Sequence, residues 1–279
     1  MSSRVASRLR SSDRDRPQAR ILGQVEVVDA GGTQVALQLQ CRKVLALLAI
    51  ARGRPVSTAQ LVRQVWGQEA PSRAAQMVRS HVRVLRSALR CRGEQALTTT
   101  PAGYRLDPAR CFIDAERFRA LLYEARQRLP DDVNGATRAA SAALDLWRDA
   151  DAMPDMAEVQ VLRAEAAHLE ELRCQAEEML MQGRLLSGRA DLALPALRRL
   201  TELYPKRERF WLQLMVAEAV SGRLVEATET TFRRARRHLV EETGLRATSL
   251  DAMQRALLEE RASVAQLLAL ITKSSHALA

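Results

Sequence analysis

An arginine stripe on one predicted helix is the strongest chemical feature of the sequence. Apolar residues at helical spacing predict a buried face over residues 73–90. Four arginines follow the same spacing a quarter-turn away: Arg79, Arg83, Arg86 and Arg90. Like charges one turn apart repel, and no acid lies between Arg73 and Arg92 to offset this. Such a stripe favours contact with a polyanion, with an ordinary solvated helix face as the alternative.

The positive charge of the whole chain is concentrated around this helix. Residues 1–110 hold 19 Lys and Arg against 7 Asp and Glu, whereas residues 111–279 hold 24 against 26. A basic domain joined to a near-neutral one favours a nucleic-acid-binding module linked to a partner-binding module. We expect Gln76 and Ser80 to face base edges. The second-tier candidates for phosphate contacts are Arg42, Thr99, Thr100 and Arg105.

Two helices and a β-hairpin are predicted before the arginine helix. Apolar residues alternate with polar ones over residues 21–40, around a turn rich in Asp and Gly, which predicts a hairpin. The period then changes, and residues 41–52 form a strongly apolar helix. Ser57 or Thr58 is expected to cap the next helix, which ends at Trp66-Gly67.

A second hairpin is predicted after the arginine helix. The arginine helix itself is expected to begin with Ser72 as its N-cap. Residues 96–106 are rich in Thr and Tyr, with Pro101-Ala102-Gly103 at the turn. Two helices, a loop, a basic third helix and a terminal hairpin predict a winged helix-turn-helix domain over residues 21–108. In this plan the third helix enters the major groove, and the hairpin contacts the backbone or the minor groove.

The second half of the chain is predicted to be helical throughout. Residues 109–272 contain short Gly, Pro and Asp breaks between helical segments, and no β-strand is predicted beyond Asp107-Pro108. Gly188-Arg189 and Gly222-Arg223 mark a repeat whose spacing matches the tetratricopeptide pattern. The predicted fold is therefore an α+β winged helix-turn-helix domain followed by an all-α tetratricopeptide-like helical-repeat domain. Residues 1–20, with six Arg, and residues 273–279 are expected to be tails, the first of them disordered.

No group of residues predicts catalysis, a metal site or a cofactor. The histidines lack a second His or Cys at ligand spacing, and the scattered cysteines include no CxxC. Phosphate-binding Gly-rich loops and the GxSxG motif are absent. No apolar run reaches the roughly 18 residues of a membrane-spanning helix, so we expect no membrane contact. The cysteine pattern is typical of a reducing cytoplasm.

The order of these motifs resembles the Streptomyces antibiotic regulatory protein family over residues 21–260. The resemblance rests on segments in both halves: Ile21-Leu22-Gly23, residues 42–48, Val65-Trp66-Gly67, Leu85-Arg86, Gly103-Tyr104, Leu146-Trp147-Arg148, residues 163–173 and Glu241-Glu242-Thr243-Gly244-Leu245. It implies an OmpR-like winged helix joined to the bacterial transcriptional activator domain. It also implies binding to direct repeats in promoters and activation of a secondary-metabolite (antibiotic) gene cluster.

The resemblance also implies partners. These are double-stranded DNA, RNA polymerase holoenzyme through its sigma factor region, and a second copy of the chain on DNA, in the cytoplasm at the nucleoid. The loop from Gly67 to Ser72 is where this fold class presents a surface to polymerase. The third helix holds His81 and Val84 where the family usually has an aromatic residue and Arg, so the target sequence is not implied. Two alternatives stay open: a helical-repeat protein-interaction adaptor with weak non-specific DNA binding, and an enzyme with an unrecognised site in the second domain.

Overall fold

The structure, a computed structural model of the 279-residue chain, describes residues 16–91, 94–129, 131–242, 244, 248–259 and 263–273. Two compact units divide the chain. Unit 1 comprises Met1–Leu121 with Ala142–Arg173, and unit 2 comprises Leu122–Ser141 with Cys174–Ala279. This division differs from the predicted boundary near residue 108, because the start of the second half packs on the N-terminal sheet.

The N-terminal sheet of unit 1 joins segments from both ends of the predicted DNA-binding domain. Its strand order is β3-β2-β1-β8. The strands are β1 Gln18–Arg20, β2 Glu26–Val28, β3 Gln34–Val35 and β8 Phe112–Ile113. Ala19 is fully buried in β1, which runs antiparallel to β2 and parallel to β8. The expected disordered tail is therefore wrong for residues 18–20, and the absence of strands beyond residue 108 is wrong as well.

The predicted first hairpin is shorter than expected. Its turn is confirmed, since the backbone N–H groups of Gly31 and Thr33 both donate to Asp29 Oδ1 at 2.9 Å. Strand pairing across this turn is limited to β2 and β3. Helix α2 already begins at Leu39, so the strand expected up to that residue is wrong.

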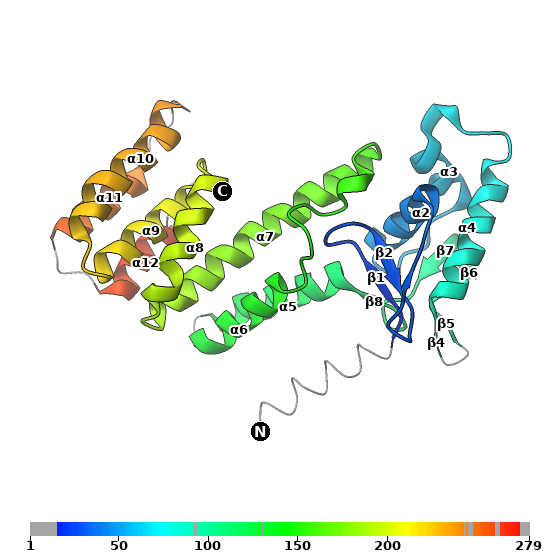
Figure 1. The fold of residues 1–279 in the computed structure, drawn as a ribbon, viewed down its shortest axis with the longest axis horizontal. Helices are drawn as coiled ribbons and strands as arrows, with labels where there is room; N and C mark the ends of the chain where they lie inside the picture. Colours follow the sequence, from blue (N-terminus) through cyan, green and yellow to red (C-terminus); the bar gives the residue numbers. More distant parts are fainter. Residues whose placement is uncertain are drawn as a thin grey trace, which may run out of the picture. The chain divides into compact units, whose positions relative to one another are not determined.

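Three helices follow in the predicted order and pack against one another (Figure 1). They are α2 Leu39–Ile50, α3 Thr58–Trp66 and α4 Ala74–Ala88, with a short turn η1 at Gly67–Glu69. Ser57 caps α3 in a reciprocal capping box with Gln60, which confirms that prediction. Ser72 does not cap α4: the N-cap residue is Arg73, without a side-chain cap, and Ala74 N–H donates instead to the Pro71 carbonyl at 2.8 Å. The predicted Ser72 cap is wrong because Pro71 begins a turn that continues into the helix.

The second predicted hairpin is confirmed as strands β6 Leu97–Thr100 and β7 Gly103–Leu106. It follows a short ladder of β4 Arg90–Cys91 and β5 Glu94–Gln95. In Figure 1, α4 lies beside β6 and α2 beside β7, so the hairpin sits at the side of the helical cluster. The winged-helix fold predicted for this part of the chain is confirmed.

The remaining segments of unit 1 pack against the N-terminal sheet. Helix α5, Asp114–Arg128, begins directly after β8, and α7, Gln160–Leu186, begins after the short turn η2 Pro154–Met156. Asp149 Oδ2 accepts the Gln24 N–H at 2.8 Å. Trp147 packs edge-on against Phe118, with ring centroids 5.6 Å apart. These long-range contacts are the reason that the compact unit extends past the winged helix.

Unit 2 is built from helices throughout its described residues. Besides the ends of α5 and α7, its elements are α6 Val133–Leu144, α8 Ala190–Leu203, α9 Glu208–Val220, η3 Glu226–Thr231, α10 Phe232–Arg236, η4 Arg237–Glu241, α11 Thr248–Leu258 and α12 Val264–Lys273. Ala193 and Ala227, which follow the repeat glycines Gly188 and Gly222 by five residues each, are fully buried. Trp211 is also buried, and its indole N–H donates to the Pro205 carbonyl at 2.8 Å. No helix in the described part of the chain is long and apolar enough to cross a membrane.

Candidate nucleic-acid interface

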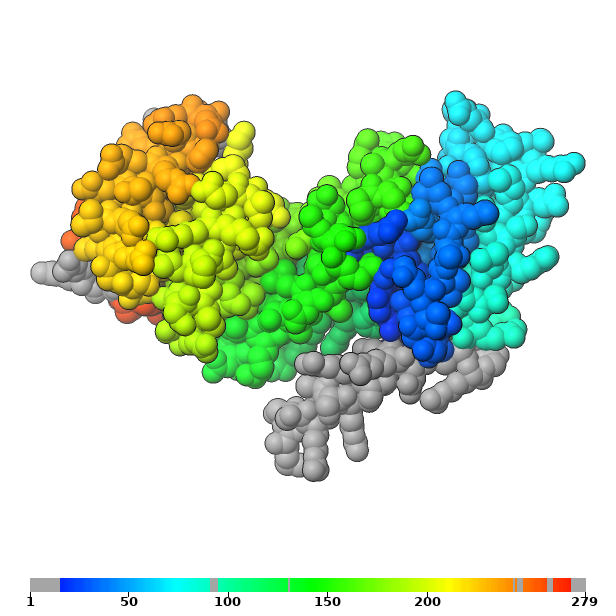
Figure 2. All heavy atoms as spheres, viewed as in Figure 1, coloured from blue at the N-terminus to red at the C-terminus, as the bar shows by residue number. Residues whose placement is uncertain are grey.

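Helix α4 separates a buried apolar face from an exposed polar one. Val78, Val82 and Leu85 are fully buried against the other helices of the winged helix. The opposite face exposes Gln76, Arg79, Ser80, Arg83 and Ser87. Figure 2 shows several long side chains of the cyan segment, which contains α4, projecting from the surface. The helix therefore presents an exposed polar face, and the major groove of duplex DNA is wide enough to admit an α-helix.

Arg79 and Arg83 carry unopposed positive charge on this face. Among the residues that the structure describes, neither of them forms an ion pair. Arginines elsewhere in the chain are often paired, for example Arg148 with Glu26 at 2.6 Å. Two adjacent cations without acids leave a local field that a phosphate backbone would neutralise.

Arg90 is exposed as predicted but does not belong to the helix. Helix α4 ends at Ala88 with Leu89 as its C-cap, and Arg90 opens β4. The expected four-arginine helical stripe is therefore wrong in its last member, because the chain turns into the β4–β5 ladder one residue before it. Arg90 remains a candidate for a phosphate contact at the end of the helix.

The side chain of Arg86 extends from α4 to the wing, which is the hairpin of β6 and β7. Its Nε donates to the Leu97 carbonyl at 3.0 Å, and its Nη2 donates to Thr99 Oγ1. The side chain is half-buried, whereas Arg79 and Arg83 are exposed. The structure thus brings two predicted site residues, Arg86 and Thr99, into direct contact and gives Arg86 a second role as a brace.

The wing is held against the connection between α2 and α3. Val56 and Tyr104 exchange two backbone hydrogen bonds, at 2.8 and 2.9 Å. Gly103 has a φ of +133°, and a Cβ there would collide with the Val56 carbonyl. Only glycine fits this close approach. Thr100 donates to the Gly103 carbonyl at 3.1 Å, and Arg105 is exposed on β7.

Arg42, unlike Arg79 and Arg83, forms an ion pair. Its Nη1 is 2.6 Å from Asp155 Oδ2, and both side chains are about four-fifths covered. Beside it, the buried Lys43 pairs with Glu158 at 3.0 Å. A phosphate would have to compete with Asp155 for the Arg42 guanidinium, a competition that Arg79 and Arg83 do not face.

His81 on α4 packs against Trp66, the last residue of α3. Their rings are stacked with centroids 6.5 Å apart. Burial lowers the pKa of His81 from its ordinary value of 6.5, so this side chain adds no charge to the face at neutral pH. All residues from Gly67 to Ser72 are exposed.

Val84 is a further exposed residue of α4 and was not among the predicted DNA contacts. It lies one turn after Ser80 and is 47% exposed. A helical wheel places it at the edge of the arginine face, so its position was available from the sequence.

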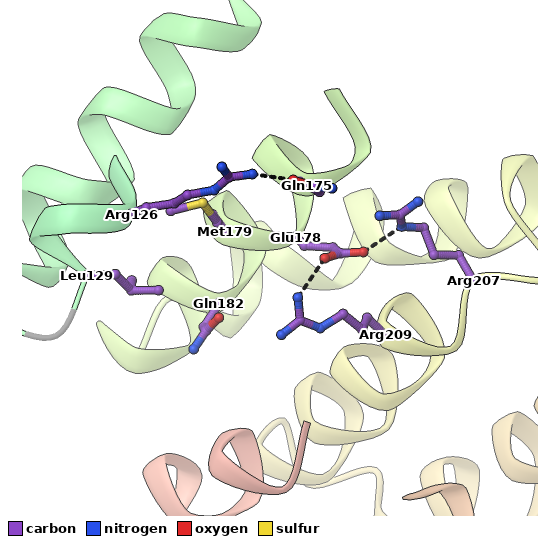
Figure 3. Close-up of a pocket in the computed structure, with 8 residues that line it drawn as sticks. All are labelled: Arg126, Leu129, Gln175, Glu178, Met179, Gln182, Arg207 and Arg209. Carbon is purple, nitrogen blue, oxygen red and sulfur yellow. Dashed lines mark hydrogen bonds and ion pairs between the residues drawn. The ribbon is translucent and has the colours of Figure 1, made fainter. Parts of the chain in front are cut away.

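One depression in unit 2 bears on the enzyme alternative (Figure 3). It has a volume of about 480 Å³ and is lined by Arg126, Leu129, Gln175, Glu178, Met179, Gln182, Arg207 and Arg209. Its single carboxylate, Glu178, is buried and accepts from Arg207 at 2.5 Å and Arg209 at 3.0 Å. The lining contains no His, Cys or Ser. A carboxylate held between two arginines is not available as a general base or nucleophile, so this depression offers no catalytic arrangement.

Comparisons with known proteins agree with this architecture. The family model "Bacterial transcriptional activator domain" matches residues 113–258, and "Transcriptional regulatory protein, C terminal" matches residues 32–106. Transcriptional regulator RedD of Streptomyces coelicolor is 35% identical over 214 residues, which cover 75% of this chain and 61% of RedD. Regulatory protein DnrI of Streptomyces peucetius is 30% identical over 251 residues, which cover 86% of this chain and 92% of DnrI.

A solved structure extends the likeness to the fold. Mycobacterium tuberculosis EmbR, in complex with a low-affinity phosphopeptide, superposes with a TM-score of 0.83 at 29% identity. The match covers 93% of this chain and 69% of the EmbR chain. The chain also spans less than two thirds of the length of RedD.

Fold, surface and comparisons together define a DNA-binding transcriptional regulator built from a winged helix and a helical activator domain. The chain belongs to the Streptomyces antibiotic regulatory protein family.

Proposed function

We propose that the protein is a sequence-specific activator that binds direct repeats in promoters and recruits RNA polymerase holoenzyme. The observation that carries this proposal is the exposed face of α4, on which Arg79 and Arg83 have no acidic partner among the described residues. The relatives named RedD and DnrI are regulatory proteins of Streptomyces, which supports a role in a secondary-metabolite gene cluster.

The contacts are assigned by position on the winged helix. Arg79, Arg83 and Arg90 contact phosphates, since they are exposed and unpaired among the described residues. Gln76 lies in the first turn of α4 and Ser80 lies between Arg79 and Arg83, on the exposed face from which side chains reach base edges. On the wing, Arg105, Thr99 and Thr100 contact the backbone. Arg86 contributes charge while it holds the wing, and Arg42 contributes only where a phosphate displaces Asp155.

The loop from Gly67 to Ser72 is the proposed surface for polymerase. It is exposed throughout, and the half-buried Trp66 stacked on His81 fixes its start. It lies on the α3–α4 connection rather than on the α4 face assigned to DNA. A sigma factor region could therefore reach it while α4 occupies the groove. Self-association then follows from two copies bound to adjacent repeats, in the cytoplasm at the nucleoid.

The adaptor alternative makes the opposite prediction for DNA. An interaction adaptor whose winged helix no longer recognises a specific sequence would bind all duplexes with similar, weak affinity, through phosphates alone. The test is a footprint of the purified full chain on its own upstream region and on neighbouring promoters, at near-physiological salt. We expect protection of at least two direct repeats about one helical turn apart. Diffuse protection that salt abolishes on every fragment would replace the activator by the adaptor.

A further inference from the structure

Val84 is an apolar side chain exposed within a polar and basic surface. Among the described residues of the segment 16–113, two large apolar side chains are exposed: Val84 at 47% and Leu39 at 41%. Only Val84 lies on α4, where its exposed neighbours are Ser80, Arg83 and Ser87. Val is also a weaker helix former than the polar residues that usually occupy such positions. Neither solvation nor helix propensity accounts for a valine here.

The surroundings restrict what Val84 can contact. A partner of this face must carry negative charge for Arg79 and Arg83 and must also offer a small apolar group. One isolated valine is too little apolar surface to insert into a lipid bilayer. In the major groove of DNA, the thymine C5-methyl group is the apolar feature that distinguishes one base pair from the others. A duplex therefore supplies both kinds of group within a few ångströms.

We propose that Val84 contacts the C5-methyl group of one thymine in each repeat and makes that base a determinant of specificity. This inference rests on the proposed DNA-binding function. A β-branched side chain has one strongly preferred χ1 rotamer in a helix, so the two methyl groups of Val84 are held in a fixed position. A fixed apolar contact favours thymine over cytosine, which presents an amino group and no methyl group.

The position along the helix also places the thymine relative to other contacts. Ser80 and Val84 are four residues apart, which is about 6 Å along the helix axis. Base pairs are stacked about 3.4 Å apart. With the helix lying in the groove, the two side chains reach different positions along it, so Val84 reads a base other than the one read by Ser80.

The experiment replaces thymines by deoxyuracils, which removes the methyl group and leaves every hydrogen-bonding group in place. The operator is first selected from random duplexes with the full chain, and each thymine is then replaced singly. Affinities are measured for the wild type, Val84→Ser and Val84→Thr. Burial of one methyl-sized group corresponds to about a fourfold change in affinity. We expect about this loss for the wild type at one thymine per repeat, a smaller loss for Val84→Thr and none for Val84→Ser.

A matched control is Val225→Ser, which removes an exposed valine from unit 2 and should leave the thymine-to-deoxyuracil ratio unchanged. The same ratio in the wild type and in Val84→Ser would overturn the assignment of Val84 while leaving sequence-specific binding intact. Failure of the wild type to select any sequence would overturn the proposed function and this assignment together. Thermal melting of each variant confirms that the exposed substitutions leave the fold unchanged.

Discussion

Arg86 on helix α4 donates to the backbone carbonyl of Leu97 on the wing at a distance of 3.0 Å. The same guanidinium reaches the Thr99 hydroxyl. Helix α4 and the β6–β7 hairpin, both proposed to contact DNA, are therefore joined by a charged hydrogen-bonding group. A preformed arrangement reduces the conformational entropy that binding would otherwise remove.

Arg86→Met tests this brace, because it keeps the apolar stem and removes the guanidinium. The Leu97 carbonyl then loses its charged donor, and we expect the free energy of unfolding to fall by about 1–2 kcal/mol. Chemical denaturation with circular dichroism gives this value. Arg83→Met, on the exposed face, is the control and should change stability by less than about 0.5 kcal/mol. Equal stabilities of the two variants would show that Arg86 holds nothing in place.

Gly103→Ala tests the contact between the wing and the α2–α3 connection. The added Cβ would collide with the Val56 carbonyl at a φ of +133°, so we expect a loss of at least about 3 kcal/mol in the free energy of unfolding. Gly188→Ala is the matched control: its φ is +69° and no atom lies within 4 Å of an added Cβ. The free energy of unfolding of that variant should fall by only about 1–2 kcal/mol, which is the cost of a left-handed backbone conformation for an alanine. Similar losses in both would mean that backbone strain alone, and not Val56, requires glycine at position 103.

Asp114 predicts a pH dependence of stability. Burial raises the pKa of this carboxyl from 3.8 to about 6, although the backbone N–H groups of Leu22 and Ile21 act in the opposite direction. The folded state then binds one more proton than the unfolded chain between about pH 4 and pH 6. The contribution of Asp114 to the free energy of unfolding is therefore greatest below pH 4 and decreases as the pH rises through 6.

Asp114→Asn removes this titration. The free energy of unfolding of the wild type, minus that of the variant, should be larger at pH 4.5 than at pH 7. Denaturant titrations at both pH values measure it. Glu178→Gln, also a buried carboxylate but one held by Arg207 and Arg209, serves as a comparison. A difference for Asp114→Asn that stays constant with pH would show that this carboxyl keeps its ordinary pKa.

The polymerase surface is tested by Gln68→Ala and Glu69→Ala together. Both side chains are exposed in the loop between α3 and α4 and contact neither the α4 face nor the wing in the described hydrogen bonds and ion pairs. Transcription from the footprinted promoter should fall several-fold in a purified system, while affinity for the same promoter DNA stays unchanged. Parallel loss of transcription and affinity would assign the loop to DNA rather than to polymerase.

Local patterns predicted the parts of the fold that local interactions determine. The Ser57 cap follows from its spacing to Gln60, and the exposed positions of Arg79 and Arg83 follow from the period of the buried residues. Pairings between distant segments could not be predicted in this way. Strand β1 pairs not only with the nearby β2 but also with β8, more than ninety residues later. For the same reason, local patterns did not predict that Asp155 pairs with Arg42 or that Arg86 braces the wing.

The proposed function requires that the exposed arginines of α4 neutralise DNA phosphates. The most direct measurement is the salt dependence of affinity for the footprinted operator, with the wild type and with Arg79→Ala/Arg83→Ala. About six phosphate contacts per protomer give a log K against log salt slope near −5, and the double variant should reduce its magnitude by about two. Arg236→Ala/Arg237→Ala, which removes two exposed arginines from unit 2, should leave the slope unchanged. A slope that is the same for all three proteins would contradict the claim.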